Sequence, residues 1–255
     1  MYFEIKDNTI PEDFRQQVWD YLLDQIWHVY TRIEKKMYFF TPSKDGLNYP
    51  STVKNAMHGV MMTRTVLGVD EPNLKQNHPI ISELWEKINH QFGDLYEISG
   101  PAEGCASDTH PDWIPPPSVI PNTAMGWRVY TNGTPSERYK RSHGVHRDTI
   151  DMHDDSTVTF LYVANMEWYP SWMAEILFYD EDPGGETGDH QQFQKSPGGY
   201  AQKRNFNIGW PSKIGSAVPG RVIAYDGRTL HTTKPAADWV DTQRVTLAFR
   251  ARLKK

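Results

Sequence analysis

The chain has 255 residues, of which 38% are hydrophobic and 13% aromatic, and it carries a formal net charge of −5 at pH 7. This supply of large apolar side chains is enough for a substantial core, so an intrinsically disordered chain is excluded. The acidic balance gives no general attraction to nucleic acid or to an anionic membrane, and neither partner is expected.

Cys105 is the single cysteine of the chain. An intramolecular disulfide and a cysteine-based zinc or iron–sulfur site are therefore excluded, and any metal must be held by histidines and carboxylates. The chain shows no basic start followed by an apolar run, and no stretch approaches about 18 apolar residues. A cytoplasmic protein without a membrane segment is expected.

Two amphipathic helices are predicted in the first part of the chain. Apolar residues recur at three- and four-residue steps over residues 11–30, and Pro11 suits a first helical turn. A second helix is predicted over residues 79–96, and Gly and Pro mark a connector between residues 100 and 123. Residues 1–126 are thus expected to form a helical support region and connector.

From residue 127 onward, short segments are rich in β-branched and aromatic residues and bounded by turn residues, which predicts strands. These segments are 127–131, 157–164, 175–179, 221–225 and 244–250. Successive strands without helical patterns between them favour an antiparallel sandwich or barrel. Residues 180–219 are rich in Gly, Gln and Ser and predict a long insertion with one short strand near 206–210. We expect a single domain, 1–255, with its core in residues 127–255.

His146 and Asp148 stand between two predicted strands and form a candidate metal-binding pair. In extended backbone, residues i and i+2 project to the same side, so both side chains can bind one ion. His231 follows the strand at 221–225 and is the candidate third ligand. Two imidazoles and one carboxylate leave coordination positions open for a cosubstrate and dioxygen, which suits Fe(II). Zinc is the alternative metal, although structural zinc normally takes four protein ligands.

Other histidines compete for the same role. His153 and Asp155 form a second His-x-Asp pattern, but it lies in an acidic, turn-like run, so the first pattern is preferred. His143 is expected to be a neighbour of the site or a surface residue, and His110 and His190 lie in predicted loops.

The order of these features resembles the Fe(II)/2-oxoglutarate-dependent oxygenases, in the prolyl 4-hydroxylase-like branch seen in bacteria and phages. The resemblance covers roughly residues 127–250 and rests on the His-x-Asp pattern, on His231 after a Pro-Gly-strand segment, and on Arg244 thirteen residues later. It implies a mostly β fold with N-terminal helices and a double-stranded β-helix (jelly-roll, cupin-like) core. His146, Asp148 and His231 would then bind the iron.

By the same resemblance, Arg244 would bind the distal carboxylate of 2-oxoglutarate, with help from Tyr130. A dicarboxylate that chelates iron through one end needs a cation at the other, and a guanidinium can bind it with two parallel hydrogen bonds. Arg250 shares the side of Arg244 on the predicted strand and could be a second anion contact, but a solvated strand end is the favoured interpretation. Met173 and Ala174 stand where relatives commonly carry two glycines, which leaves the substrate class open.

The implied reaction is hydroxylation of an unactivated C–H bond of an amino acid, peptide or small metabolite, with conversion of 2-oxoglutarate to succinate and CO2. Dioxygen is the oxidant and ascorbate a candidate additional reductant. Because Asp148 supplies a carboxylate, halogenation is not expected. The alternatives are a 2-oxoglutarate-dependent nucleic-acid demethylase, which the acidic charge disfavours, and a non-catalytic cupin-like binding protein. The substrate identity and the oligomeric state do not follow from the pattern.

Overall fold

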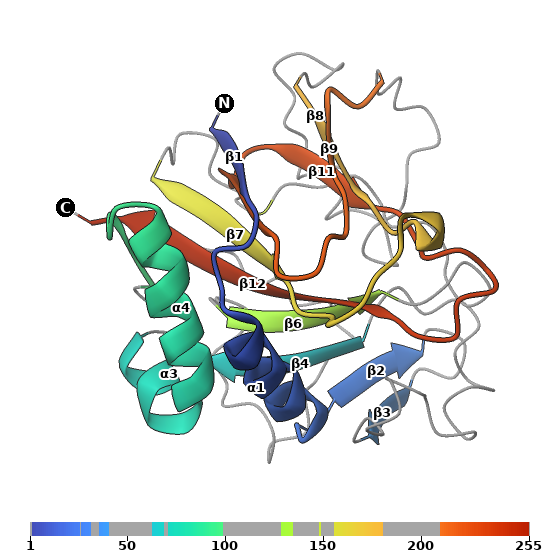
Figure 1. Ribbon diagram of the computed structural model, residues 1–255, viewed down its shortest axis with the longest axis horizontal. Helices are drawn as coiled ribbons and strands as arrows, with labels where there is room; N and C mark the ends of the chain where they lie inside the picture. Colours follow the sequence, from blue (N-terminus) through green and yellow to red (C-terminus); the bar gives the residue numbers. More distant parts are fainter. Residues whose placement is uncertain are drawn as a thin grey trace.

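The computed structural model describes residues 2–25, 71–98, 148, 156–180 and 210–254 in full, and the backbone of four further strands. In these parts the chain is mostly β, with antiparallel strands in two sheets and three α-helices near the N-terminus (Figure 1). The expected class, mostly β with N-terminal helices, is confirmed at this level.

The larger sheet has nine strands, with β12 near its centre. Along the main path the order is β1 (Phe3–Lys6), β10 (Val222–Asp226), β7 (Thr157–Val163), β12 (Arg244–Leu253), β6 (Val129–Thr134), β4 (Thr63–Gly68), β2 (Trp27–Thr31) and β3 (Lys36–Phe40). The short strand β5 (Tyr96–Glu97) pairs with β12 outside this path. Because every pairing is antiparallel, successive side chains point alternately to the two faces.

The smaller sheet has three strands in the order β11 (Leu230–Thr233), β8 (Ile176–Tyr179) and β9 (Lys213–Gly215). A short 3-10 turn, η1 (Pro170–Trp172), precedes β8. The two sheets face each other, because buried residues of both form one apolar cluster: Leu161, Ile176, Phe178, Ile223, Tyr225 and Ala248.

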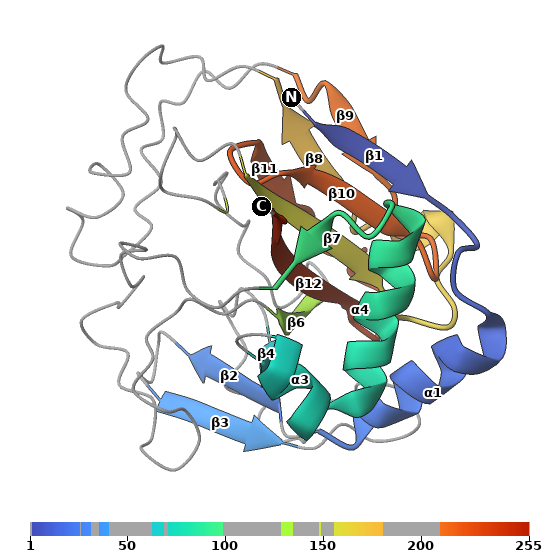
Figure 2. The same ribbon diagram turned by 90° about the vertical axis from the view of Figure 1, so that its left-hand side faces the viewer.

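The helices α1 (Glu12–Leu23), α3 (Glu71–Asn77) and α4 (Pro79–Gln91) pack on the opposite face of the larger sheet (Figure 2). Trp85 of α4 stacks on Phe249, with ring centroids 5.4 Å apart, and lies edge-on to Phe160. Strand β7 is covered on both faces, so all its residues are buried, including the polar Thr157 and Thr159. None of the helices in the described parts of the chain is long and apolar enough to cross a membrane.

The five strands predicted from residue 127 onward are present as β6, β7, β8, β10 and β12, with small shifts of their ends. The helix predicted over 79–96 is present as α4, but it ends at Gln91, before Gly93, and Tyr96 belongs to β5. The helix predicted over 11–30 ends earlier, at Leu23, and its last part belongs to β2, whose Trp-His-Val-Tyr-Thr sequence suits a strand. The strand predicted near 206–210 lies largely outside the described residues, and β9 follows it.

Candidate metal centre

The structure describes two of the three predicted metal ligands and brings them together in the interior. Nε2 of His231 lies 3.8 Å from Oδ2 of Asp148, and the two side chains are only 6% and 4% exposed. Donor atoms bound to one ion through bonds of about 2.1 Å lie roughly 3 to 4 Å apart, so this separation suits a shared cation. His146 and the competing pair His153 and Asp155 lie outside the described residues.

Carbonyl groups of the turn between β10 and β11 accept hydrogen bonds from both Asp148 and His231. The backbone N–H of Asp148 donates to the carbonyl of Gly227 at 2.9 Å, and Nδ1 of His231 lies 3.0 Å from the carbonyl of Thr229. A carbonyl only accepts, so Nδ1 carries the proton and Nε2 offers its lone pair. The turn therefore fixes a tautomer in which His231 can bind a metal through Nε2.

Asp226 and Arg228 brace this turn. Asp226 accepts a hydrogen bond from the backbone N–H of Arg228 at 2.9 Å and one from its guanidinium at 2.5 Å. Burial raises the pKa of Asp226, but the hydrogen bonds and the charge of Arg228 outweigh burial and lower it. Asp226 and Arg228 are therefore both charged at neutral pH, and their ion pair stabilises the turn that precedes His231.

Three side chains of the described residues donate hydrogen bonds to the carboxylate of Asp148. The hydroxyls of Tyr225 and Thr159 donate to Oδ2 at 2.6 and 2.9 Å, and Nη2 of Arg250 donates to Oδ1 at 2.6 Å. The favoured interpretation of Arg250 as a solvated strand end is therefore wrong. Its position in β12 directs it to the interior face, where the buried carboxylate attracts the guanidinium.

Sequence reasoning missed Tyr225 and Thr159. Tyr225 is 1% exposed, and its hydroxyl oxygen lies 3.3 Å from Nε2 of His231 as well as against Asp148. Phe178 packs on the Tyr225 ring in a T-shaped contact at 5.0 Å. A signal was available, because Tyr225 follows three apolar residues at the end of the predicted strand 221–225 and stands six residues before His231.

Arg244 is buried on the same side of β12 as Arg250. It is 2% exposed, and its Nη1 donates to the backbone carbonyl of Ala174 at 2.8 Å. Burial lowers the pKa of Arg244 to about 10, while Glu175 and Tyr225 act in the opposite direction. The guanidinium is therefore still a cation at neutral pH, inside the space between the sheets.

Tyr130 lies in β6, where its backbone is paired opposite Ala248 of β12. Only the backbone of β6 is described, so the predicted contribution of the Tyr130 side chain to cosubstrate binding lies outside the described part.

The turn that contacts Arg244 has an unusual backbone. Met173 has φ 59° and ψ −136°, and Ala174 has φ 69°, in a region that favours glycine. The carbonyl of Met173 accepts a hydrogen bond from the indole N–H of Trp168 at 2.9 Å, and that of Ala174 faces Arg244. Met173 and Ala174 thus stand where the oxygenases that this sequence resembles commonly have two glycines. Their backbone still has the positive φ angles typical of glycine.

Among the described residues, no group of three or more His, Cys, Asp or Glu side chains could hold a metal. The donor types present, an imidazole nitrogen and a carboxylate oxygen, suit Fe(II) and other divalent transition metals.

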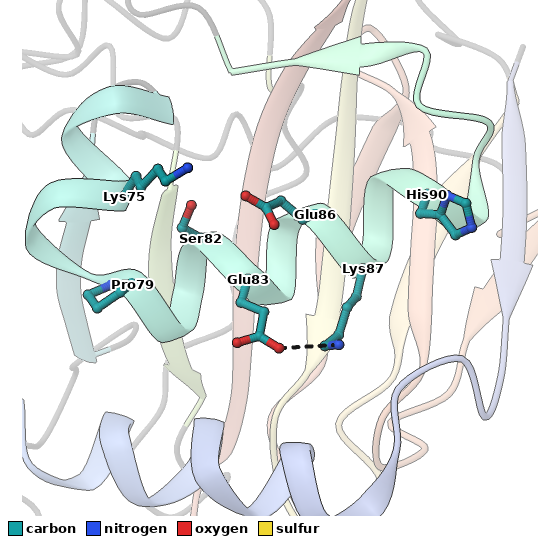
Figure 3. A pocket seen from close by; sticks show the side chains of 7 residues that line it. All are labelled: Lys75, Pro79, Ser82, Glu83, Glu86, Lys87 and His90. Carbon is teal, nitrogen blue, oxygen red and sulfur yellow. Dashed lines mark ion pairs between the residues drawn. The ribbon is translucent and has the colours of Figure 1, made fainter.

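A surface hollow lies along α3 and α4, on the helix-covered side of the larger sheet (Figure 3). Its lining carries both signs of charge: Lys75, Pro79, Ser82, Glu83, Glu86, Lys87 and His90. Lys87 and Glu83 form an ion pair with a separation of 3.2 Å. The interior site of Asp148 and His231 lies on the other face of the sheet, so the hollow is separate from it.

No family model matches the chain, and a comparison with curated proteins gives no match. Solved structures that match include a Pseudomonas putida prolyl-4-hydroxylase, with 13% identity and a TM-score of 0.42, covering 99% of this chain and 93% of that one. The non-heme α-ketoglutarate-dependent epimerase SnoN from nogalamycin biosynthesis has 11% identity and a TM-score of 0.48, covering 98% and 78%. YcfD, a ribosomal oxygenase from Escherichia coli, has 7% identity and a TM-score of 0.41, covering 99% and 48%.

Proposed function

We propose that the chain is an Fe(II)- and 2-oxoglutarate-dependent dioxygenase with His146, Asp148 and His231 as its iron ligands. The observation that carries the proposal is the 3.8 Å separation of His231 Nε2 and Asp148 Oδ2, with both side chains buried between the sheets. The lone pair of Nε2 and the carboxylate are directed to one place, and His146 stands two residues before Asp148 in the sequence. Two imidazoles and one carboxylate leave the open positions that oxygen chemistry requires.

The two facing sheets are proposed to form a double-stranded β-helix core within a single domain, residues 1–255. Pairing across the chain supports one domain, since β1 lies against β10 and β5 lies against β12. Residues 1–126 would supply edge strands and helical cover, and residues 127–255 the catalytic core.

Arg244 is proposed to anchor the distal carboxylate of 2-oxoglutarate, with Tyr130 assisting. The buried guanidinium stands on the interior face of β12, and the carbonyl of Ala174 fixes one of its nitrogens. A bidentate contact from a guanidinium orients a dicarboxylate as well as binding it. The packed space between the sheets would exclude bulk water, and bound iron would activate dioxygen.

The proposed reaction is hydroxylation of an unactivated C–H bond in an amino acid, peptide or small metabolite, with release of succinate and CO2. Asp148 keeps a carboxylate where a halogenating site needs room for a halide. The net charge of −5 opposes binding of a nucleic acid, which favours a small-molecule or peptide substrate.

The test is anaerobic titration of the protein with Fe(II) and 2-oxoglutarate. We expect a weak visible charge-transfer band, and succinate formation once air and a suitable substrate are added. His231→Ala should lose both signals, whereas His90→Ala, at an exposed position of α4, should keep them. If the wild-type protein gives no band and forms no succinate across amino acids, peptides and methylated nucleotides, the proposed function is wrong.

A further inference from the structure

We infer that Tyr225 is a positioning residue of the metal centre, whose phenol fixes the Asp148 carboxylate for binding through a single oxygen. The inference rests on the proposed function, in which Asp148 is a metal ligand. Tyr225 acts through Asp148 and does not itself need to contact the substrate.

The side chains that contact Asp148 come from one row across three neighbouring strands. In the register of the larger sheet, Arg250 of β12 lies opposite Thr159 of β7, and Thr159 lies opposite Tyr225 of β10. Side chains at opposite positions of antiparallel strands project to the same face and lie close together. The register of the sheet thus places the hydroxyls of Tyr225 and Thr159 and the guanidinium of Arg250 beside the Asp148 carboxylate.

The two oxygens of the Asp148 carboxylate accept hydrogen bonds from different partners. Arg250 binds Oδ1, whereas Tyr225 and Thr159 both donate to Oδ2, the oxygen that lies 3.8 Å from His231 Nε2. The guanidinium holds Oδ1 to one side, and the hydroxyls fix the rotation of the carboxylate. Oδ2, the oxygen 3.8 Å from His231 Nε2, would then be the one that binds the metal.

The Tyr225 hydroxyl donates its single proton to Asp148. Nδ1 of His231 donates to the carbonyl of Thr229, so Nε2 offers a lone pair. The hydroxyl of Tyr225 is 2.6 Å from the carboxylate and 3.3 Å from Nε2, and a charged acceptor at the shorter distance takes the proton. The phenol proton is therefore directed at Asp148, which leaves the Nε2 lone pair for the metal.

Direct binding of the phenol oxygen to the metal would conflict with the proposed reaction. A fourth protein ligand would leave an octahedral ion two positions, and a chelating 2-oxoglutarate would need both of them. No position would remain for dioxygen. A phenol that donates to Oδ2 keeps the third position open.

The test compares Tyr225→Phe with Tyr162→Phe in the apoprotein, titrated with Co(II) under argon without 2-oxoglutarate. Tyr162 is a matched control because it is buried in the neighbouring strand β7 but belongs to the helix-side cluster. Loss of a hydrogen bond to a metal ligand weakens metal binding by about 10- to 100-fold. We expect a Co(II) Kd at least tenfold weaker for Tyr225→Phe and unchanged for Tyr162→Phe. Thermal unfolding of each apoprotein checks that both variants are folded.

A second measurement uses the unmutated protein and does not depend on the folding of a variant. If Tyr225 stays protonated, Co(II) binding produces no ultraviolet difference band of a phenolate, and the oxidised iron protein shows no intense visible phenolate band. Either band, if it is lost in Tyr225→Phe, would identify Tyr225 as a direct ligand and overturn the inference, as would wild-type Co(II) affinity in Tyr225→Phe. If the wild-type protein binds no Co(II) at all, the proposed function itself fails.

Discussion

The interior between the sheets holds two guanidinium groups on one face of a single strand. Arg250 pairs with the Asp148 carboxylate at 2.6 Å, and Arg244 donates to the carbonyl of Ala174. Burying a cation costs several kcal/mol unless anionic or strongly polar groups offset the loss of hydration. Asp148 offsets the charge of Arg250, and the nearby Glu175 favours the charged form of Arg244, so both cations are stabilised in the interior.

At Arg244 the geometry of the cation should matter as much as its charge. Arg244→Lys keeps a positive charge but removes the planar fork that binds a carboxylate with two hydrogen bonds. We expect the Kd for 2-oxoglutarate, measured by anaerobic titration of the Fe(II) protein, to rise about tenfold or more, which is about 1.4 kcal/mol.

Arg252→Lys, near the end of the same strand, is the control and should leave the affinity unchanged. Equal 2-oxoglutarate affinity in the Arg244→Lys variant and the wild-type protein would remove Arg244 from the proposed site.

The turn before β8 joins backbone geometry to the buried cation. Met173 and Ala174 both have positive φ, and such a conformation costs a residue other than glycine about 1 to 2 kcal/mol. The conformation persists because the flanking contacts hold it, with Trp168 on one carbonyl and Arg244 on the next. Strain of this kind is concentrated at functional sites.

Met173→Gly should relieve that strain. The side chain is 47% exposed, so its loss removes little packing, and the gain should exceed the entropic cost of glycine. We expect the free energy of unfolding to rise by about 0.5 kcal/mol in urea denaturation. Met173→Ala removes nearly the same side chain but keeps the strained backbone, so it should not stabilise the protein. Equal effects of the two variants would show that the φ angle is not the cause.

The contact between α1 and α4 predicts a dependence of stability on pH. The hydroxyl of Tyr21 lies 2.6 Å from Nδ1 of His78, the residue before α4. Burial lowers the pKa of His78 below its usual value of 6.5 and raises the pKa of Tyr21, so a neutral imidazole accepts from the phenol. The folded state then binds fewer protons than the unfolded chain below about pH 6.5.

Stability should therefore fall as the pH drops below about 6.5, with the loss complete once the pH is below the lowered pKa of His78. His78→Asn removes the titrating group and retains a residue suited to a helix N-cap. We expect a shallower fall of the melting temperature over this range in the variant. If the wild-type protein and the variant lose stability in parallel, His78 does not contribute to the pH dependence.

The strands differ in how well the sequence alone predicts them. Strands β7, β10 and β12 were predictable because their β-branched and aromatic runs are unambiguous. Strand β11 has four residues and was missed, although it carries His231. Strands β1 to β4 were missed because they depend on pairing with distant partners, and β-propensity alone is a weak guide.

The same limit applies to the candidate site. Asp148 and His231 could be paired from spacing and pattern, and the structure brings them together. Tyr225, Thr159 and Arg250 could not be assigned to Asp148, because their row depends on the register of three strands. Register is set by pairing and packing across the whole sheet, which a single sequence does not display.

At the scale of the whole molecule, segments from both halves of the chain support the interior site. Strand β1 pairs with β10, and Asp7 forms a two-pronged ion pair with Arg221, both contacts at 2.7 Å. Phe3 lies opposite Tyr225 in the register, so it continues the row that contacts Asp148. Its ring meets Phe178 edge-on at 5.0 Å, and Phe178 lies 6.0 Å from the His231 ring.

Phe3→Ala should therefore weaken the metal centre through Phe178 and Tyr225. Loss of the ring leaves Phe178 and Tyr225 without support on one side, and partial burial of Phe3 limits the cost to about 2 kcal/mol of unfolding free energy. Tyr2→Ala removes a ring of similar size that packs on the helix-side cluster, so it should lower stability and leave Co(II) affinity unchanged. We expect calorimetry to show weaker Co(II) binding in Phe3→Ala alone. Equal Co(II) affinities in the two folded variants would mean that β1 stabilises the sheet without shaping the site.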